Sequence, residues 1–451
     1  MSLPTITDKR IHVQPSQVHD VLGRHMLADG YDIVMDLRKS HGSWMFDARK
    51  GRKMLDFFSN FASCPIGYNH PRMDNPEFRE RLADVALNKI ANSDIYTTYM
   101  AEFVETFARL AVPAAYRKHL FFVEGGALAI ENAVKAAFDW KVRKNFAKGH
   151  KEERGRQIMH LREAFHGRTG YTLSLTNTAD PRKTQYFPKF DWPRLPNPKL
   201  RFPVTDEVVA EVERVEKEAI DLAKTYLAER KDDIAAFVME PIQGEGGDNH
   251  FRPEFFRAIR QLCDENDMLL VFDEVQSGVG ITGKMWAFEH YGVEPDMFCF
   301  GKKTQVCGFA SNDRIAEASE NVFNISSRIN STWGGNLTDM VRSQRYFEII
   351  DEERLVENAA RAGAELRKGL GELAARKPDL VSNVRGLGLM CAFDLPSGEI
   401  RDAAMNTMEA NDLLVLASGH RSIRFRPHLN VTAEEIAEGI ARVEKSLQGA
   451  A

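Results

Sequence analysis

Short apolar segments that alternate with helical patterns constrain the middle of this chain most strongly. The segment "HLFFVE" precedes "GGALAIENAVKAAFDWKV", "DIAAFVMEP" leads to "FRPEFFRAIRQLCDEND", and "MLLVFDEVQSG" comes before "DMFCFGKK". Strands separated by helices need crossover connections, which place helices on both faces of a mostly parallel sheet. We therefore predict an α/β fold, in which ligands collect at the carboxyl ends of the strands.

The length of the chain and a change of pattern along it predict more than one domain. A chain of 451 residues exceeds one ordinary domain. We expect a large domain at 61–337 and a smaller α+β domain at 338–451, where long amphipathic helices precede a few short strands. The segment 1–60, which has a hairpin-like pattern, is expected to contribute to the small domain. The proline-rich region 176–205 predicts a long ordered surface loop.

Composition excludes several classes of protein. The formal net charge of −5 does not favour a nucleic-acid partner. No apolar run approaches the ~20 residues that a membrane helix needs, and the N-terminus lacks the apolar core of a signal peptide. The five cysteines are scattered without a CxxC pair, which predicts reduced thiols and no metal site. We therefore expect a cytoplasmic protein.

Polar residues follow three of the predicted strands. Gly125 and Gly126 lie between a strand and a helix, where they form either a simple tight turn or a phosphate site at the helix start. Asp273 ends a strand, where it either forms a structural ion pair or holds a protonated ring nitrogen. Lys302 and Lys303 follow another strand. Adjacent extended residues point in opposite directions, so at most one lysine faces a ligand; alternatively, both pair with acids at the sheet rim.

Glycine patterns suggest two different cofactor sites, and we retain one of them. "GVGITG" at 278–283 fits the dinucleotide pattern, but it neither follows a strand directly nor opens a long helix, so we reject that site. The glycine turn, the strand-end aspartate and the strand-end lysine match the needs of pyridoxal 5′-phosphate. That cofactor requires an amine for a Schiff base, a carboxylate for its ring nitrogen and backbone donors for its phosphate.

With these residues in place, the sequence resembles the class III pyridoxal-phosphate aminotransferases, which have fold-type I. The resemblance extends from about residue 20 to 430 and is carried by "FFVEGGALAIENAVKAAFDWK", "AFHGRTGYTLSLTNT", "FPKFDWPR", "EPIQGEGGDNHFRPEFF", "FDEVQSG", "FGKKTQVCG", "NSTWGGNLTDM" and "RFRPHL". The strings "FGKKTQVCG" and "FPKFDWPR" are more specific than the general family pattern. They resemble the members of the family that act on the ε-amino group of lysine.

The resemblance assigns roles around the cofactor. It implies that Lys302 forms the Schiff base, that Lys303 is structural and that Asp273 binds the ring nitrogen. It also implies a homodimer with shared active sites, because Thr332 would reach the phosphate of the neighbouring subunit's cofactor. The other implied cofactor contacts are backbone donors at Gly126 and Ala127, a ring stacked by Phe165, and side chains of Glu240 and Gln276.

The resemblance also implies the reaction, namely transfer of the ε-amino group of L-lysine to 2-oxoglutarate. The products would be L-glutamate and 2-aminoadipate 6-semialdehyde, which cyclises. Arg424 would bind the carboxylate beside the cofactor, and Glu245 would cover Arg424 when lysine is bound. Arg168 would hold the distal carboxylate with help from Asn330, and Gln276 would lie beside the substrate. Without the family context, Arg168 and Arg424 are better explained as ion pairs at the rim, and Glu245 as a loop charge.

One departure and two rival functions stay open. The family commonly reads RFxPPL, whereas this chain has Arg424, Phe425, Arg426, Pro427 and His428, so Arg426 competes with Arg424 for the site, although Arg424 keeps the spacing to Pro427. Phe61 is expected to line the pocket. The nearest rival is another ω-aminotransferase, acting on ornithine, acetylornithine or 4-aminobutyrate, because one methylene changes preference by only ~1–3 kcal/mol. The second is a cofactor-binding protein without turnover.

Overall fold

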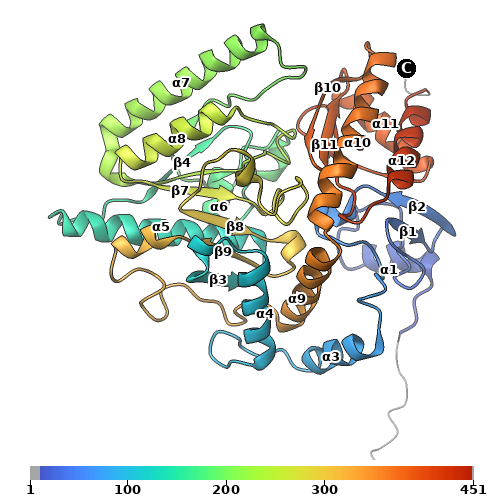
Figure 1. Ribbon diagram of the computed structural model, residues 1–451, viewed down its shortest axis with the longest axis horizontal. Coiled ribbons are helices and arrows are strands. Elements are labelled where there is room, and N and C mark those ends of the chain that lie inside the picture. Colours follow the sequence, from blue (N-terminus) through green and yellow to red (C-terminus); the bar gives the residue numbers. More distant parts are fainter. Residues whose placement is uncertain (1–10, 449–451) are drawn as a thin grey trace, which may run out of the picture.

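A seven-stranded sheet forms the centre of the computed structural model, which describes residues 11–448 (Figure 1). Its strand order is β3-β9-β8-β7-β6-β4-β5. Only β9 runs antiparallel to its neighbours, so the predicted mostly parallel sheet is confirmed. The strands are β3 (His119–Val123), β4 (Gln157–Leu161), β5 (Arg194–Leu195), β6 (Ile234–Met239), β7 (Leu269–Asp273), β8 (Met297–Phe300) and β9 (Cys307–Ser311).

Both faces of the central sheet are covered by helices, as the alternating pattern predicted. Successive strand residues point to opposite faces. Phe272 belongs to the core that includes residues of α8 (Pro253–Glu265) and α4 (Thr98–Leu110). Val271 belongs to the core on the other face, against α5 (Gly126–Ala147). The strands are buried on both faces, which explains their nearly continuous apolar sequences.

Two smaller sheets join the ends of the chain. Strands β1 (Trp44–Asp47) and β2 (Arg52–Asp56) form a hairpin, and β2 pairs in parallel with β12 (Leu413–Leu414). The blue N-terminal strands accordingly lie beside the red C-terminal helices (Figure 1). The third sheet contains β10 (Ser382–Leu387), β11 (Met390–Asp394), β13 (Leu416–Ser418) and β14 (Ser422–Phe425). The domain limits at 60 and 337 stay predictions.

The remaining elements surround these sheets. The other helices are α1 (Val18–Gly23), α2 (Ser59–Ala62), α3 (Pro76–Ala86), α6 (Gly170–Leu175), α7 (Asp206–Arg230), α9 (Leu337–Glu352), α10 (Leu355–Arg376), α11 (Gly398–Ala410) and α12 (Ala433–Ser446). Region 176–205 is mostly irregular, with a 3-10 turn at Pro181–Lys183 and the short strand β5. The five cysteines are free. Within 11–448, no helix is both long and apolar enough to cross a bilayer.

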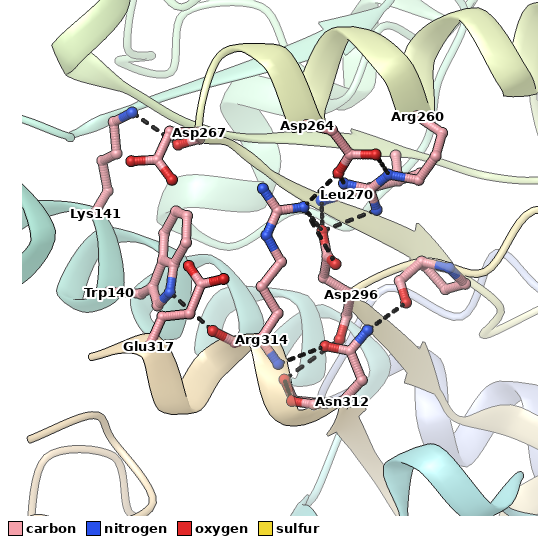
Figure 2. Close-up of polar contacts among 12 residues, drawn as sticks. Trp140, Lys141, Arg260, Asp264, Asp267, Leu270, Asp296, Asn312, Arg314 and Glu317 are labelled. Carbon is pink, nitrogen blue, oxygen red and sulfur yellow. Dashed lines mark hydrogen bonds and ion pairs between the residues drawn. The ribbon is translucent and has the colours of Figure 1, made fainter. Parts of the chain in front are cut away.

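Charged residues are fully paired where β8 begins, a group that we call the Asp296 cluster (Figure 2). The buried Asp296 carboxylate accepts hydrogen bonds from Arg260 Nη1 at 2.9 Å, Arg314 Nη1 at 3.2 Å and the Leu270 amide at 2.7 Å. The exposed Asp264 bridges the same two arginines, at 2.7 Å from Arg260 and 2.8 Å from Arg314. The cluster fixes α8 and β7 against the start of β8.

Candidate active site

A cavity of about 670 Å³ opens at the opposite end of the strands. It is lined by residues that follow β4, β6, β7 and β8, by the start of α5 and by β14. Parallel strands deliver their carboxyl ends to one edge of a sheet, which explains how positions far apart in sequence meet. The predicted site residues in its wall are Gly126, Ala127, Phe165, Arg168, Glu240, Glu245, Asp273, Gln276, Lys302 and Arg424.

The structure distinguishes the two lysines that follow β8. Lys302 lines the cavity, and burial together with the nearby Arg424 lowers its pKa to about 8. Lys303 is buried away from the cavity, where its Nζ donates to the carbonyl oxygens of Gln276 at 2.7 Å and Ala62 at 3.4 Å. Burial lowers the pKa of Lys303 well below its usual value. Lys302 is therefore the amine that a ligand can reach.

Asp273 is held at the end of β7 by a histidine that sequence analysis did not single out. Its Oδ2 lies 2.8 Å from His166 Nδ1, and its Oδ1 accepts the Val275 amide at 3.0 Å. His166 is buried, and its Nε2 has no hydrogen-bond partner among residues 11–448. The Asp273 carboxylate thus faces the cavity with His166 as a fixed partner.

Two glycines beside the cavity are closely packed, one at the start of α5 and one in the loop that follows β4. Gly125 has φ +99°, and Gly126 begins the 22-residue helix α5. A Cβ atom at Gly126 would lie 3.0 Å from Val275 Cγ1, and one at Gly167 would lie 2.5 Å from Ala127 Cβ. The helix start therefore presents bare backbone N–H groups to the cavity, an arrangement suited to an anion.

Glu240 fixes two loops of the cavity wall. Its carboxyl group accepts the Phe165 amide at 2.8 Å and the Gly244 amide at 3.0 Å. Burial, followed by the nearby Asp273, raises the pKa of Glu240 well above its usual value. This residue thus sets the position of Phe165 and also lines the cavity.

Of the two candidate arginines, Arg424 lines the cavity and Arg426 does not. Arg424 donates from Nη1 to Gln276 Oε1 at 2.9 Å and from Nε to the Ala417 carbonyl at 3.1 Å. Burial, and then Arg426, lower the pKa of Arg424 to about 10. Arg426 is fully buried, forms an ion pair with Asp248 and also donates from Nη2 to Gln276 Oε1 at 2.9 Å. One amide oxygen therefore orients both guanidinium groups.

Glu245 lies in the cavity wall, but its contacts differ from the expected cover over Arg424. Its Oε1 accepts Lys183 Nζ at 2.5 Å and Thr178 Oγ1 at 2.7 Å. The physical reason is that Lys183, a cation from the proline-rich region, also lines the cavity. The exposed Arg168 lines the same cavity.

Phe61 lies in the cavity wall on a strained turn. Ser59, Asn60, Phe61 and Ala62 all have positive φ, between 41° and 63°, a conformation that costs non-glycine residues energy. The buried Asp56 supports this turn, because its Oδ1 accepts the amides of Phe58 and Ser59. His428, at the position of the family's second proline, is buried at 3.8 Å from Asp56 Oδ2.

Asn330 and Thr332 do not line the cavity. Both are exposed, and the Thr332 carbonyl accepts Ser93 Oγ at 3.4 Å. Their expected roles, at a distal carboxylate and at a neighbouring subunit's cofactor, stay predictions.

Several cavity residues were missed by sequence reasoning. His166 directly follows Phe165 in "AFHGRTG", so its position after a strand was an available signal. Lys183, which lines the cavity, and Thr178, which contacts Glu245 without lining it, belong to an irregular segment, where no periodicity indicates which way a side chain points. Further residues in the wall are Tyr31, Gly167, Val275, Met405, Leu416 and Ala417.

Comparisons with known proteins agree with this geometry. The family model "Aminotransferase class-III" matches residues 26–447. The L-lysine-epsilon aminotransferase of Mycobacterium tuberculosis is 54% identical over 96% of each chain. That of Amycolatopsis lactamdurans is 50% identical over 95% of each. A solved structure of the lysine aminotransferase from M. tuberculosis in the internal aldimine form superposes with a TM-score of 0.95 at 52% identity, covering 97% of this chain and 100% of that one. The chain belongs to the class III aminotransferase family.

Proposed function

We propose that this protein is a transaminase that moves the ε-amino group of L-lysine to 2-oxoglutarate. The products are L-glutamate and 2-aminoadipate 6-semialdehyde, which cyclises to piperideine-6-carboxylate. The observation that carries the chemistry is the cavity in which Lys302 and Asp273 meet the start of α5. The choice of lysine is supported by the high identity to relatives that are named for this substrate.

Class III aminotransferases use pyridoxal 5′-phosphate, and the cavity fits this group. Lys302 would attach it, Asp273 would face its ring nitrogen, and the bare amides at Gly126 and Ala127 would receive its phosphate. The fit rests on the glycine contacts, since a side chain at Gly126 would press on Val275. When bound, the cofactor supplies an aldehyde for the amine and a protonated ring that withdraws electrons.

Lys302 has two tasks in this proposal. Its amine holds the cofactor between turnovers. Once an incoming amine has replaced it, the neutral Lys302 Nζ would take the proton from the carbon that bears the reacting nitrogen, and the resulting ammonium would donate a proton to the carbon that carried the cofactor's aldehyde. A pKa of about 8 leaves a useful fraction of the amine neutral near pH 7–8, as a general base requires.

Asp273 places its carboxyl group on the proposed ring side of the cavity, and His166 holds it there. A carboxylate at hydrogen-bonding distance from a ring nitrogen favours the protonated ring. The 2.8 Å contact with His166 fixes the direction in which the carboxylate points. His166 is thus a positioning residue for Asp273.

Two arginines separate the two ends of the substrate. Arg424 lies in the buried part of the wall, and a guanidinium group binds a carboxylate with two parallel hydrogen bonds. We assign the carboxylate next to the reacting carbon of 2-oxoglutarate to Arg424 and the distal carboxylate of either substrate to the exposed Arg168. Lysine presents only methylene groups beside Arg424, so lysine is accepted better when Arg424 is covered.

The assembly that we propose is a homodimer. The exposed Thr332 and Asn330 lie outside the cavity of their own chain, which suits a role at a neighbouring subunit. Sedimentation of the purified protein tests this proposal. A monomer with full activity would contradict it. The cytoplasmic location stays a prediction.

A product assay tests the proposed reaction. The protein is incubated with 2-oxoglutarate and either lysine, ornithine, acetylornithine or 4-aminobutyrate, and formation of L-glutamate is measured for all four donors. The cyclic imine expected from lysine is trapped with o-aminobenzaldehyde. We expect the highest kcat/KM with lysine. A higher value with any of the other donors would replace lysine by that donor, and failure to react with all four would favour a protein without turnover.

A further inference from the structure

Arg424 is a buried cation that has no carboxylate partner within 4.0 Å among the residues that the structure describes. Its hydrogen bonds go to one amide oxygen and one backbone carbonyl. Neighbouring Arg426, by contrast, is paired with the buried Asp248. A buried charge without a counterion is costly, so Arg424 attracts any carboxylate that can reach it.

Glu245 is a carboxylate in the wall of the same cavity, and it is bound by only one of its oxygens. Oε1 accepts hydrogen bonds from both Lys183 Nζ and Thr178 Oγ1, whereas Oε2 is buried and has no hydrogen-bond partner in the part of the chain that the structure describes. Among the charges that act on Arg424, Glu245 is close enough to favour its charged form. Glu245 therefore shares the cavity wall with two cations, Lys183 and Arg424, and contacts the first.

Lys183 enters the cavity from the irregular segment between α6 and β5. It is the last residue of the 3-10 turn Pro181–Lys183, and its side chain is one-third exposed. Its ammonium also lies 5.9 Å from the centre of the Phe165 ring, within the range of a cation–π contact. Lys183 is thus a partly exposed residue of the cavity wall, and its ammonium contacts Glu245 and the Phe165 ring.

We propose that Lys183 and Thr178 hold Glu245 away from Arg424 and so set how readily Arg424 accepts a substrate carboxylate. The inference rests on the proposed function, and it assigns two positioning residues to that site. With Lys183 present, Glu245 has a partner outside the carboxylate site, and Arg424 stays open. Without it, Glu245 turns to Arg424, and an incoming carboxylate must displace it.

The two amino donors of the proposed cycle respond differently to this competition. L-Glutamate carries a carboxylate on its reacting carbon and needs Arg424 open. L-Lysine carries none there and is better accepted when Glu245 covers Arg424. A ligand shifts such an equilibrium only by its different affinity for the two positions. Loss of Lys183 therefore weakens the reaction with glutamate relative to the reaction with lysine.

The test compares both donors on one form of the enzyme. Lys183→Met holoenzyme is mixed with glutamate or with lysine, and loss of the aldehyde absorption band is followed in single turnovers. We expect the ratio of kcat/KM for lysine to kcat/KM for glutamate to rise roughly ten-fold, as loss of a charge-assisted hydrogen bond implies. Thr178→Val raises the ratio less. Lys189→Met, an exposed lysine of the same segment, leaves it unchanged.

A double variant shows whether the effect passes through Glu245. In the Glu245→Ala background, Lys183→Met causes no further change in the ratio of the two kcat/KM values. With Glu245 present, Lys183→Arg keeps the ratio close to the parental value, because arginine retains the positive charge. A ratio that stays within two-fold of the parental value in Lys183→Met overturns the proposal. A full ten-fold effect in the Glu245→Ala background also overturns it, because Lys183 then acts directly on the substrate.

The experiment separates this proposal from the proposed function. If the parental protein reacts with glutamate but not with lysine, the choice of lysine is wrong. The effect of Lys183→Met on glutamate and 2-oxoglutarate still reports on Arg424. An unchanged KM for both of these ligands would then reject the positioning role on its own.

Discussion

The two ends of β8 carry charged residues of opposite sign, and they differ in whether an oppositely charged side chain lies close by. Asp296 precedes the strand, and two arginines and a backbone amide satisfy its carboxylate (Figure 2). Lys302 follows the same strand within six residues, yet no carboxylate lies within 4.0 Å of its amine in the described part of the chain. Its pKa falls to about 8.

This difference indicates that one end of β8 contributes to stability and the other end to the reaction. A buried charge with good partners resists removal, because its loss leaves the partners unpaired. A charge held without a counterion costs stability but is ready to lose its proton. The amino edge of the sheet therefore fixes the fold, and the carboxyl edge prepares the reaction.

The sharpest way to break the comparison is to remove the amine. We expect Lys302→Ala to lower kcat by about 10⁴-fold or more, since one group serves as attachment point and as proton carrier. Thermal unfolding of the cofactor-free protein should show no loss of stability, because an unpaired charge is removed. A variant that still transfers amino groups at a tenth of the parental rate would contradict this role.

The matching change at the other end should affect stability and leave catalysis intact. Asp296→Asn is expected to lower the free energy of unfolding by about 3 kcal/mol, because Arg260 and Arg314 lose their buried partner. Denaturant unfolding measures the loss, and activity per folded molecule stays near the parental value. Asp264→Asn is the control, since Asp264 is more than half exposed and costs at most ~1 kcal/mol.

The acidity of Lys302 predicts how cofactor loading depends on pH. Because the neutral amine attacks the aldehyde, loading of the cofactor-free protein should slow roughly 25-fold from about pH 8.5 to about pH 6.5. The folded pKa lies below the unfolded value, so the unfolded chain binds more protons in between, and stability rises with pH from about 8 toward about 10.5. A Lys302→Ala protein should lack this rise. A loading rate that is flat over this range would reject the lowered pKa.

The smallest effect is expected for His166, the residue that contacts Asp273. His166→Phe should lower kcat about ten-fold, as expected when a charge-assisted hydrogen bond is lost, and should change KM little. The absorption band of the bound cofactor should also shift as its ring loses a fixed carboxylate. His166→Asn, which keeps a donor, should recover part of the rate. Equal loss in both variants, without a spectral shift, would indicate a purely structural histidine.

Local sequence patterns predicted the parallel sheet and its ligand-bearing edge, because strand periodicity and the residues at strand ends are local. Family resemblance was needed to choose between Lys302 and Lys303, and the structure shows why: Lys303 is buried against carbonyl groups behind the site. The choice between Arg424 and Arg426 depends on Asp248, which is remote in sequence.

The partner of Glu245 was not predictable for a related reason. Lys183 lies in an irregular segment, where neither a helical nor a strand period indicates which way a side chain points. The expected cover over Arg424 considered only Glu245 and Arg424, whereas Lys183 also lies in the cavity wall. The dimer roles of Asn330 and Thr332 stay predictions, as do the domain limits.

The pairing of β12 with β2 has a consequence for biosynthesis. The groups assigned to the cofactor within one chain, from Gly126 to Lys302, leave the ribosome well before Arg424 and the strand that joins the C-terminal region to the N-terminal hairpin. A nascent chain therefore contains the residues assigned to the cofactor within one subunit before it contains Arg424, which is the last of the proposed site residues to be synthesised.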